Sequence, residues 1–445
     1  MRVIIVGAGE VGYQIAKFLS REVIDVIVID KDKEKLRRIV EDIDVAVVEG
    51  EGGSPSTLRE AEADKADIIL AVTDKDETNM IACLLAKAMF GIPRKIARIR
   101  NPEYFYNEKL LSRENLDIDP AINPELELAK AVMRILEVPQ ATDIEEFEGG
   151  LVKVIGFKIP EGSSLIDKSL RKLGMTLNKK ILIGIILRED KTIIPKGSDV
   201  IRASDIIYIP IKKEEIEDTL TLLGMSRKPI KRVMLLGGGR TGYYISSAIE
   251  QKADVKIIEK DLDRCKFLTR NLRKTLVLHG DGTEQKILIE ENVGDMDAFI
   301  AASNNDELNI MVSLFAKKLG AKKTIAVVNK TDYMLLAHSL GLQSVLSPRL
   351  ITASTILRYV RKGDILSLTA IAEAKAEIIE GRIGKTSPLL GKTLDQTQPD
   401  KSIIGAIIRG EEVIIPSGSD KIIEGDKLII FTLRESIKDV EKILI

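Results

Sequence analysis

Short runs of apolar residues alternate with longer amphipathic segments along most of the chain. Residues Val3–Leu19, with the sequence VIIVGAGEVGYQIAKFL, predict a buried strand, a glycine-rich turn and a helix. The strands that follow are nearly continuous apolar runs, which is typical of a parallel sheet covered by helices on both faces. Strands that alternate with helices in this way predict a doubly wound α/β domain.

The same order of elements returns in the second half of the chain. Val233–Ile249 reads VMLLGGGRTGYYISSAI and matches the first strand, turn and helix. Three further matches keep the register: VIVIDKD (26–32) with VKIIEKD (255–261), LAVTDKDETNM (70–80) with IAASNNDELNI (300–310), and KIARIRNPEY (95–104) with TIAVVNKTDY (324–333). So many matches in register indicate an internal repeat.

A smaller, β-rich module follows each predicted α/β domain. Its two copies match over Gly184–Ile209 and Gly405–Ile430, which share a Pro-x-Gly-Ser turn. An amphipathic helix precedes each copy, at Pro124–Leu136 and at Pro348–Val360. The apolar face of this helix either covers its own domain or packs on another subunit. The two modules therefore occur in the order A-B-A-B.

The predicted fold class is α/β, with two doubly wound Rossmann-type parallel-sheet domains, each followed by a small α+β domain. A length of 445 residues suits about two to four domains. The expected boundaries are 1–123 for the first Rossmann-type domain, 124–149 for a crossover helix and linker, 150–226 for the first small domain, 231–347 for the second Rossmann-type domain, 348–363 for a second crossover helix, and 364–445 for the second small domain.

The glycine-rich turn of the first half has the spacing of a dinucleotide-binding loop. Gly7 permits the tight turn, Gly9 lets a pyrophosphate approach the backbone, and Gly12 lets the helix pack close to the strand. Asp30 follows at the end of the second strand, where a carboxylate accepts hydrogen bonds from ribose hydroxyls and repels a 2′-phosphate. These features predict NAD or NADH as a ligand, with ATP and ADP as alternatives.

Other residues of the first half are expected to border the same crevice, because residues at the carboxyl ends of parallel strands line the ligand site. Thr73 and Asp74 follow the fourth strand, although they can also serve as a cap for the next helix. Glu51 follows the third strand and is either a ligand contact or a turn residue. The predicted first site comprises Gly7, Ala8, Gly9, Glu10, Val11, Gly12, Asp30, Glu51, Thr73, Asp74 and Arg98.

The second half keeps the glycine pattern but changes the charges around it. Arg240 replaces Glu10, while Val327 replaces Arg98, so a cation is lost at the end of that strand. The second half binds a nucleotide, binds a different ligand or serves only as a scaffold. Its candidate residues are Gly237, Gly238, Gly239, Arg240, Thr241, Glu259, Ser303 and Asn304.

Composition narrows the function classes. Lys and Arg number 67 and Asp and Glu 68, and this balance argues against a nucleic-acid-binding surface. No apolar run reaches the roughly 18 residues of a membrane-spanning helix, and the N-terminal residues do not resemble a signal peptide. The two cysteines, Cys83 and Cys265, lack metal-site or redox spacing, and Cys83 is expected to pack in a core. A cytoplasmic location is expected.

The sequence shows no catalytic constellation and predicts a sensor rather than an enzyme. Its only histidines are His279, expected in a turn, and His338, expected in a helix. No nucleophile elbow, Walker A loop or metal-ligand cluster occurs. An NAD-dependent oxidoreductase and a scaffold with unused sites are the competing interpretations.

The motifs GAGEVG, VIVID, AVTDKDETNM and IARIRNPEY, within the A-B-A-B order, resemble the regulator-of-potassium-conductance (RCK) family, whose modules are also called TrkA-N and TrkA-C domains. The resemblance covers essentially the whole chain. It implies a nucleotide-sensing regulatory subunit, peripheral on the inner face of the cell membrane, whose partner is a Trk-type membrane potassium channel or transporter. It also implies self-association into a ring of RCK domains. A regulator of another cation transporter or antiporter is the alternative.

The resemblance also assigns roles by position. It implies that Gly7 to Val11 hold the phosphates, that Asp30 holds the adenosine ribose, and that Thr73, Asp74 and Arg98 make further nucleotide contacts. In the second half the corresponding residues are Gly237 to Thr241 and Glu259, and Ser303 and Asn304 align with Thr73 and Asp74.

Overall fold

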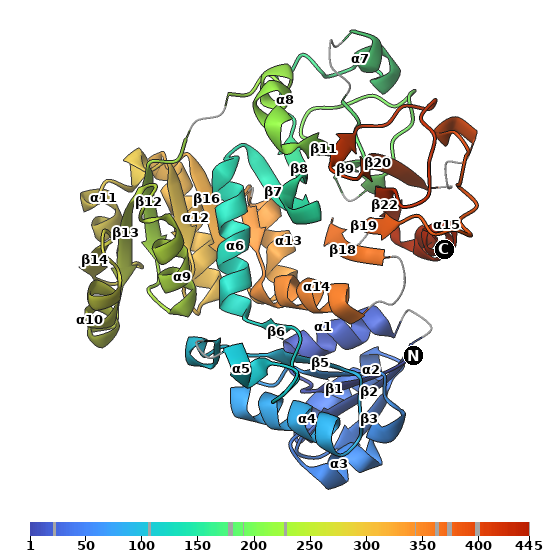
Figure 1. Cartoon of the computed structure of the whole chain (residues 1–445). Helices are drawn as coiled ribbons and strands as arrows, with labels where there is room; N and C mark the ends of the chain where they lie inside the picture. The colour runs from blue at the N-terminus through green and yellow to red at the C-terminus, as the bar shows by residue number, and fades with distance from the viewer. Residues whose placement is uncertain are drawn as a thin grey trace.

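The computed structural model describes residues 1–20, 24–105, 108–176, 181–189, 191–226, 229–342, 344–360, 365–371, 376–396 and 401–444. Within these ranges the chain forms two six-stranded parallel sheets and two five-stranded antiparallel sheets, in alternating order along the sequence (Figure 1). The fold class predicted from the sequence is confirmed.

The first parallel sheet has the strand order β3-β2-β1-β4-β5-β6, which is that of a Rossmann domain. Its elements are β1 (Arg2–Val6), α1 (Glu10–Leu19), β2 (Asp25–Asp30), α2 (Lys33–Asp42), β3 (Ala46–Glu49), α3 (Pro55–Glu60), η1 (Ala63–Lys65), β4 (Ile68–Ala71), α4 (Asp76–Ala88), β5 (Arg94–Arg98), η2 (Pro102–Phe105), α5 (Glu108–Leu111) and β6 (Ala121–Ile122).

Strand β1 shows why this sheet is buried on both faces. Val3 and Ile5 lie in one apolar cluster with residues of α1 and α2, and Ile4 and Val6 lie in another with residues of α3 and α4. Because successive side chains of a strand point to opposite faces, a continuous apolar run fills both cores. Cys83 of α4 belongs to the second cluster, and burial raises the pKa of its thiol to about 12.

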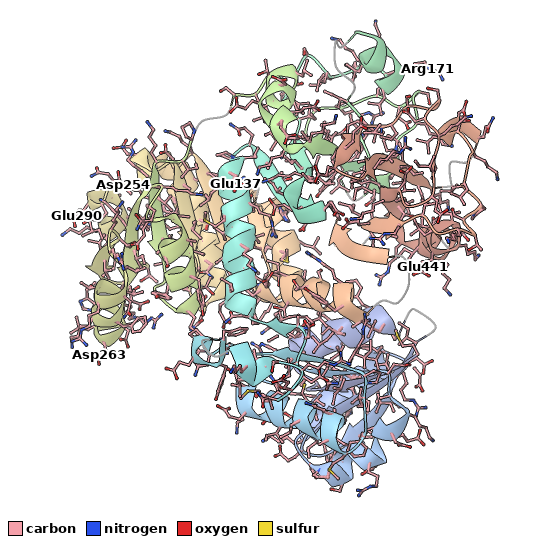
Figure 2. The ribbon with its side chains drawn as sticks, in the orientation of Figure 1. Glu137, Arg171, Asp254, Asp263, Glu290 and Glu441 are labelled. Atoms are coloured by element: carbon pink, nitrogen blue, oxygen red, sulfur yellow. The ribbon has the colours of Figure 1, made fainter. Side chains whose placement is uncertain are left out.

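The second parallel sheet repeats the order as β14-β13-β12-β15-β16-β17. Its elements are β12 (Arg232–Leu236), α9 (Arg240–Ile249), β13 (Asp254–Glu259), α10 (Leu262–Asn271), β14 (Leu276–His279), α11 (Gln285–Glu290), η5 (Val293–Asp295), β15 (Ala298–Ala301), α12 (Asp306–Leu319), β16 (Lys323–Val327), α13 (Thr331–Ser339) and β17 (Ser344–Leu346). His338 lies in a helix as predicted, whereas His279 ends a strand and does not lie in a turn. Charged side chains such as Asp263 and Glu290 project outward from α10 and α11 (Figure 2).

The two small domains also share one strand order, β7-β8-β11-β9-β10 in the first and β18-β19-β22-β20-β21 in the second. The first comprises β7 (Ala141–Phe147), η3 (Glu148–Gly150), β8 (Val152–Lys158), α7 (Leu170–Thr176), β9 (Ile185–Arg188), β10 (Lys191–Ile193), β11 (Ile206–Lys212), η4 (Lys213–Glu215) and α8 (Ile216–Leu222). The second comprises β18 (Ile365–Ile371), β19 (Ala376–Arg382), η6 (Leu394–Gln396), β20 (Ser402–Arg409), β21 (Glu412–Ile414), β22 (Lys427–Leu433), η7 (Arg434–Ser436) and α15 (Ile437–Leu444). Strand β7 lies within the range that the sequence analysis assigns to a crossover helix and linker.

The two crossover helices, α6 (Pro124–Glu137) and α14 (Pro348–Val360), each pack on the Rossmann domain of the other half (Figure 1). From α6, the residues Ala129, Val132, Ile135 and Leu136 share a core with the second sheet and α9. From α14, the residues Ala353, Ile356, Leu357 and Val360 share a core with the first sheet and α1. The apolar face therefore covers the opposite half of the same chain, which differs from both destinations expected from the sequence.

The two small domains pack face to face. Tyr208 and Val154 of the first share an apolar cluster with Ile378 and Phe431 of the second. A Cβ atom at Gly184 would lie 2.4 Å from the Phe431 ring, so only glycine fits there. The halves are thus joined through both their Rossmann domains and their small domains.

A buried lysine lies where the first small domain meets the second Rossmann domain. Lys323 Nζ of β16 donates a 2.5 Å hydrogen bond to the carbonyl of Ala141 in β7, and the Lys323 residue is only 4% exposed. Burial lowers the pKa of Lys323 to about 7, an effect that nearby Asp143 opposes. Burial also raises the pKa of Asp143 to about 6, although the Tyr208 hydroxyl donates a 2.8 Å hydrogen bond to that carboxylate.

Replacing Ile135 by Ala tests the exchanged packing of α6. The Ile135 side chain is buried between α6 and the second sheet, so we expect a loss of about 2–5 kcal/mol of stability. Hydrogen exchange followed by mass spectrometry should show faster exchange in α9. Leu126→Ala, at an exposed position of the same helix, is the control and should change little. Faster exchange in α1 instead of α9 would contradict the exchanged arrangement.

Replacing Lys323 by Met tests the buried ammonium. In the wild type the pKa of Lys323 is lower in the folded state than in the unfolded state, so the unfolded chain binds the additional proton between about pH 7 and 10.5. Wild-type stability should therefore rise relative to that of Lys323→Met as the pH increases through this window, and the advantage should disappear as the pH falls through 7. Melting temperatures of both proteins at pH 7 and pH 9.5 measure the effect. A constant difference between them would show that Lys323 stays charged when buried.

Candidate functional site

The glycine-rich turn of the first half joins β1 to α1 and is fixed by sterics. Gly7 has a φ of +112°, which strains any residue with a Cβ atom, and its amide donates to the Ile29 carbonyl at 2.8 Å. A Cβ atom at Gly12 would lie 1.9 Å from the Gly7 carbonyl oxygen. A Cβ atom at Gly9, by contrast, would meet nothing within 4 Å. Two glycines therefore shape the turn, and the third leaves open space at the start of the helix.

Asp30 stands at the end of β2 and stabilises this turn through hydrogen bonds. Its Oδ2 accepts a 2.6 Å hydrogen bond from the Ala8 amide, and its Oδ1 accepts a 2.9 Å hydrogen bond from the Asp32 amide. Each carboxylate oxygen has a second lone pair, so the group can still accept hydrogen bonds from a ligand. The residue predicted to hold a ribose is thus held beside the loop predicted to hold phosphates.

On the other side of the crevice, a buried asparagine organises the strand ends. Asn79 Oδ1 accepts hydrogen bonds from the Thr73 amide (2.9 Å) and the Thr73 hydroxyl (2.7 Å). Its Nδ2 donates to the carbonyls of Thr73 (3.1 Å) and Arg98 (2.8 Å). Asn79 therefore ties the end of β4 to the end of β5. It is absent from the predicted site, although an asparagine at the same place in both copies of the repeat, Asn79 and Asn309, is a usable signal.

Asp76 has a related supporting role and was also absent from the predicted site. It begins α4, and its carboxylate accepts hydrogen bonds from the amides of Arg100 (3.0 Å) and Asn101 (2.8 Å). Asp306 holds the amides of Asn329 (2.9 Å) and Lys330 (2.8 Å) in the second half. A carboxylate therefore fixes the loop after the fifth strand in each domain.

Arg98 ends β5 with an incompletely satisfied guanidinium. Its Nη1 donates to the Thr73 carbonyl at 3.3 Å, and its buried Nε has no hydrogen-bond partner among the residues that the structure describes. Burial lowers the pKa of Arg98, and the neighbouring Arg100 lowers it further. Arg100 itself forms an ion pair with Glu125 at the start of α6. A partly buried guanidinium with an unused donor favours an anionic ligand.

The remaining predicted residues of the first half lie at the edge of the crevice. Glu10 opens α1 and faces Arg38 (3.4 Å) and Arg349 of α14 (3.6 Å). Glu51 is exposed and pairs with Lys31 at 3.3 Å, and Asp74 is exposed. The Val11 side chain is buried in the core, so only the backbone of Val11 is available to a ligand.

The second half reproduces the steric and supporting parts of the site. Gly237 has a φ of +99°, a Cβ at Gly242 would lie 2.0 Å from the Gly237 carbonyl oxygen, and a Cβ at Gly239 would again meet nothing within 4 Å. Glu259 accepts hydrogen bonds from the amides of Gly238 (2.6 Å) and Asp261 (2.8 Å). Its longer side chain thus makes the same two contacts as Asp30.

The strand ends of the second half are held in the same way. Asn309 accepts from the Ser303 amide (3.0 Å) and hydroxyl (2.6 Å) and donates to the Val327 carbonyl (2.8 Å). Asn304 is exposed, as Asp74 is, and Thr241 lies half-buried in the first turn of α9. The duplicated fold therefore presents two crevices with one backbone geometry.

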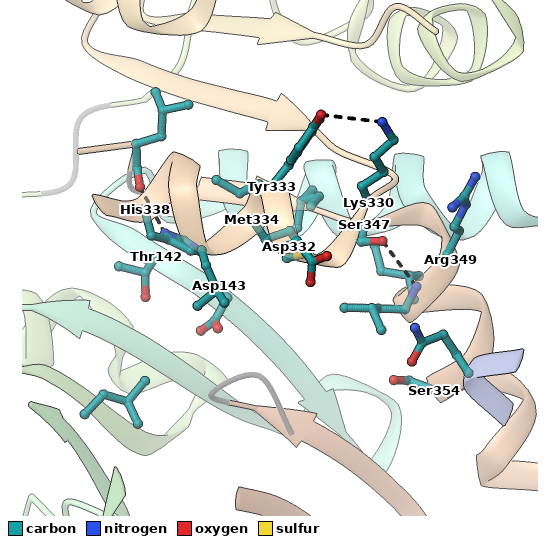
Figure 3. Close-up of a pocket in the computed structure, with 18 of the residues that line it drawn as sticks. Thr142, Asp143, Lys330, Asp332, Tyr333, Met334, His338, Ser347, Arg349 and Ser354 are labelled. Atoms are coloured by element: carbon teal, nitrogen blue, oxygen red, sulfur yellow. Dashed lines mark hydrogen bonds between the residues drawn. The ribbon is translucent and has the colours of Figure 1, made fainter. Parts of the chain in front are cut away.

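A separate cavity of about 1250 Å³ lies where the domains meet, between α1, β7, α13 and α14 (Figure 3). Its lining includes Tyr13, Asp143, Lys330 and His338. The His338 ring forms a 3.0 Å hydrogen bond with the Leu342 carbonyl, which indicates a structural role for this histidine. Of the residues predicted for the first site, Glu10 alone is in the lining of this cavity.

The described residues include no group of three or more His, Cys, Asp or Glu side chains arranged to hold a metal ion. In the same ranges, no helix combines the length and apolar character needed to cross a membrane.

Both crevices present backbone amides at a helix N-terminus, an acidic residue beside them and a polar strand end. This arrangement suits a phosphate-bearing ligand with a ribose.

Comparison with known proteins identifies the family. The model of the TrkA-N domain matches residues 3–124 and 233–348, and the model of the TrkA-C domain matches residues 154–224 and 378–445. The chain belongs to the TrkA family. It is 36% identical to the Trk system potassium uptake protein TrkA of Halomonas elongata, over 100% of this chain and 98% of that protein. It is 38% identical to TrkA homolog 1 of Methanosarcina mazei, over 99% of both.

Solved structures of RCK proteins share the fold. The GsuK RCK domain superposes with a TM-score of 0.62 at 16% identity, covering 100% of this chain and 94% of that one. The GsuK channel bound to NAD also gives a TM-score of 0.62 at 16% identity, covering 100% of this chain and 78% of that one. The family resemblance noted from the sequence is therefore confirmed, and both copies of the repeat match the family.

The three glycines of the first loop should respond differently to substitution. Gly12→Ala forces a methyl group against a backbone carbonyl that cannot move freely, so we expect a loss of at least about 2 kcal/mol. Gly9→Asp places a favourable N-cap residue in open space with a φ of −64° and should leave stability unchanged or slightly higher. Thermal unfolding of both variants checks the contrast. Equal destabilisation would contradict the open space at Gly9.

Proposed function

We propose that this protein is a nucleotide-sensing regulatory subunit that gates a Trk-type membrane potassium channel or transporter, and that it is not an enzyme. The observation that carries the proposal is the geometry of the first crevice. There is open space beside Gly9 at the start of α1, Asp30 stands at the glycine loop, and Arg98 has an Nε without a hydrogen-bond partner among the described residues. The relatives named Trk system potassium uptake protein TrkA support the choice of partner.

The ligand of the first crevice is proposed to be NAD or NADH, with ATP or ADP as alternatives. Neighbouring structures of GsuK are described as bound to NAD and as bound to ADP, which supports a nucleotide in this fold. The Gly9, Glu10 and Val11 amides would hold phosphate, and Asp30 would hold the adenosine ribose. The Ala8 amide already donates to Asp30, so Ala8 would act by positioning that carboxylate.

The remaining residues predicted from the sequence are kept as proposed contacts. Gly7 and Gly12 would act by shaping the loop, and Glu51, Thr73, Asp74 and Arg98 would border the ligand. The corresponding residues of the second half are Gly237, Gly238, Gly239, Arg240, Thr241, Glu259, Ser303 and Asn304.

The residues around the crevice support sensing rather than turnover. A dehydrogenase needs a proton donor or acceptor beside the hydride-transfer position. Asn79 and Asp76 of α4 hold the chain after β4 and β5, and both side chains are already engaged with backbone groups there. A ligand there would act by favouring one arrangement of the domains, and a tenfold difference in affinity between two arrangements supplies about 1.4 kcal/mol per site.

The family context supports the remaining parts of the proposal. The protein would be cytoplasmic and peripheral on the inner face of the cell membrane, and it would self-associate into a ring of RCK domains. The domain boundaries expected from the sequence are retained, except that we place the start of the first small domain at β7, because this strand pairs with β8.

Potassium flux through the co-reconstituted membrane partner tests the proposed function. We expect NAD, NADH, ATP or ADP to change the flux. Gly9→Asp should weaken nucleotide binding at the first crevice about 100-fold or more, because a carboxylate would face the phosphate. Gly9→Asp should remain folded, as argued above, so a lost response would report the ligand site. Flux that is indifferent to all four nucleotides, or oxidation of NADH over a substrate panel, would overturn the proposal.

A further inference from the structure

The two crevices share one backbone geometry but place their positive charges differently. In the first, Arg98 and Arg100 stand at the end of the fifth strand, and the arginines near the glycine loop are paired with Glu10. In the second, Val327 and Asn329 occupy these positions, and the cations lie at the glycine loop. This difference bears on which ligand each crevice can hold.

Arg240 and Arg264 flank the second glycine loop. Arg240 is the first residue of α9, at the helix N-terminus that a phosphate would approach, and it is exposed with no ion-pair partner in the described part of the chain. Arg264 reaches across from α10, and its Nε donates a 2.6 Å hydrogen bond to the Gly238 carbonyl. The equivalent positions in the first half are Glu10 and Lys35. Glu10 pairs with the two arginines near the first loop, so these already face a carboxylate, whereas Arg240 has no such partner among the described residues.

Arg264 keeps donors available for a ligand. A single hydrogen bond uses one of the five N–H donors of its guanidinium, which also stacks at 4.3 Å over the Phe267 ring. Burial lowers the pKa of Arg264, the Glu259 carboxylate raises it, and the charge of Arg240 lowers it. Two neighbouring guanidinium groups favour a ligand with more negative charge than a bridging pyrophosphate carries.

The end of β16, on the far side of the second crevice, is apolar. Val327 is 4% exposed and forms an apolar cluster with Ala302 and with Leu128 of α6, against which Leu346 and Ile351 pack. In a Rossmann domain a dinucleotide crosses the switch point between the first and fourth strands, and its second half extends over this side. Ser303 remains at this strand end, but the apolar Val327 supplies no cation to a second ribose or its phosphate.

The first crevice has the opposite character. Polar groups stand on both sides of its switch point, with Asp30 on one side and Thr73 and Arg98 on the other. The buried Nε of Arg98 has no partner among the described residues, which leaves a donor for a ligand that spans the crevice. At its glycine loop, Glu10 pairs with Arg38 and Arg349, so these two cations are already engaged with a carboxylate rather than available to a phosphate chain.

We propose that the two sites take different nucleotides, a dinucleotide in the first and a nucleoside di- or triphosphate in the second, where Arg240 and Arg264 hold the phosphate chain. This inference rests on the proposed function, because it assumes that both crevices bind nucleotides. The protein would then respond to two chemical signals through two sites of one fold.

Calorimetric titration of the full-length chain with NAD and with ATP assigns the ligands to the sites. Gly9→Asp and Gly239→Asp form a matched pair, since both replace an N-cap glycine in open space. We expect Gly9→Asp to abolish NAD binding at the first site and to retain ATP binding at the second. Gly239→Asp should abolish ATP binding at the second site and retain NAD binding at the first. Loss of both ligands in one variant, or the opposite assignment, would overturn the inference.

A charge-removal experiment tests the role of the arginines. The double variant Arg240→Gln/Arg264→Gln should bind ATP tenfold or more weakly and bind NAD unchanged. In the wild type, the affinity of the second site should rise from AMP to ADP to ATP. Lys266→Gln, at an exposed position of the same helix, is the control. Arg240→Gln alone, at an exposed position, checks the result if the double variant unfolds.

Two outcomes separate this inference from the proposed function. Binding of NAD without any binding of ATP would overturn the different-ligand assignment and leave nucleotide sensing intact. Binding of neither nucleotide to the wild type would overturn both. Preferential binding of NADP to the second site would also contradict the assignment, because it would show a dinucleotide there with Arg264 on its 2′-phosphate.

Discussion

The exchange of the crossover helices is the interaction on which the rest of the structure depends. Helix α6 leaves the first Rossmann domain and buries its apolar face on the second, and α14 does the converse (Figure 1). As a result, α1 and α9, the helices that begin at the two glycine loops, each lie between their own sheet and a helix from the other half. Close-packed interfaces of this kind do not deform continuously, so a displacement at one loop is transmitted to the opposite half.

Much of the fold could be predicted from local patterns. The sequence shows apolar runs such as β1, and it shows glycines at positions where the backbone geometry admits no other residue. It also shows a second copy that matches the first. The destination of α6 was not visible, because amphipathicity shows that a face is buried but not which surface buries it. Strand β7 was also missed. Its sequence, ATDIEEF, contains three acidic residues, and a bulge between Ala141 and Ile144 breaks the alternation that identifies a strand.

The same distinction applies to the site. Asp30 and the glycines were predictable because a single short segment fixes their geometry. Asn79 and Asp76 were not predictable, because both contact the end of β5 and the loop after it, which lie 19 residues or more further along the chain. The steric requirements hold in both halves, as Gly12 and Gly242 show, whereas the charges at positions such as Arg98 and Val327 differ. Backbone clashes tolerate no substitution, but a charge at a crevice rim can change with the ligand.

The exchanged helices have a consequence for a chain divided at the linker before β12. Each separated half would retain a complete Rossmann sheet yet expose the apolar face of its own crossover helix and the bare surface of α1 or α9. Two such halves would bury these exposed surfaces by pairing around a twofold axis, as identical subunits do. The intact chain thus has the layout of a covalently fused dimer, in which the tether makes pairing independent of concentration. Fusion of this kind also removes the need for the two partners to be identical, and it leaves each half free to specialise.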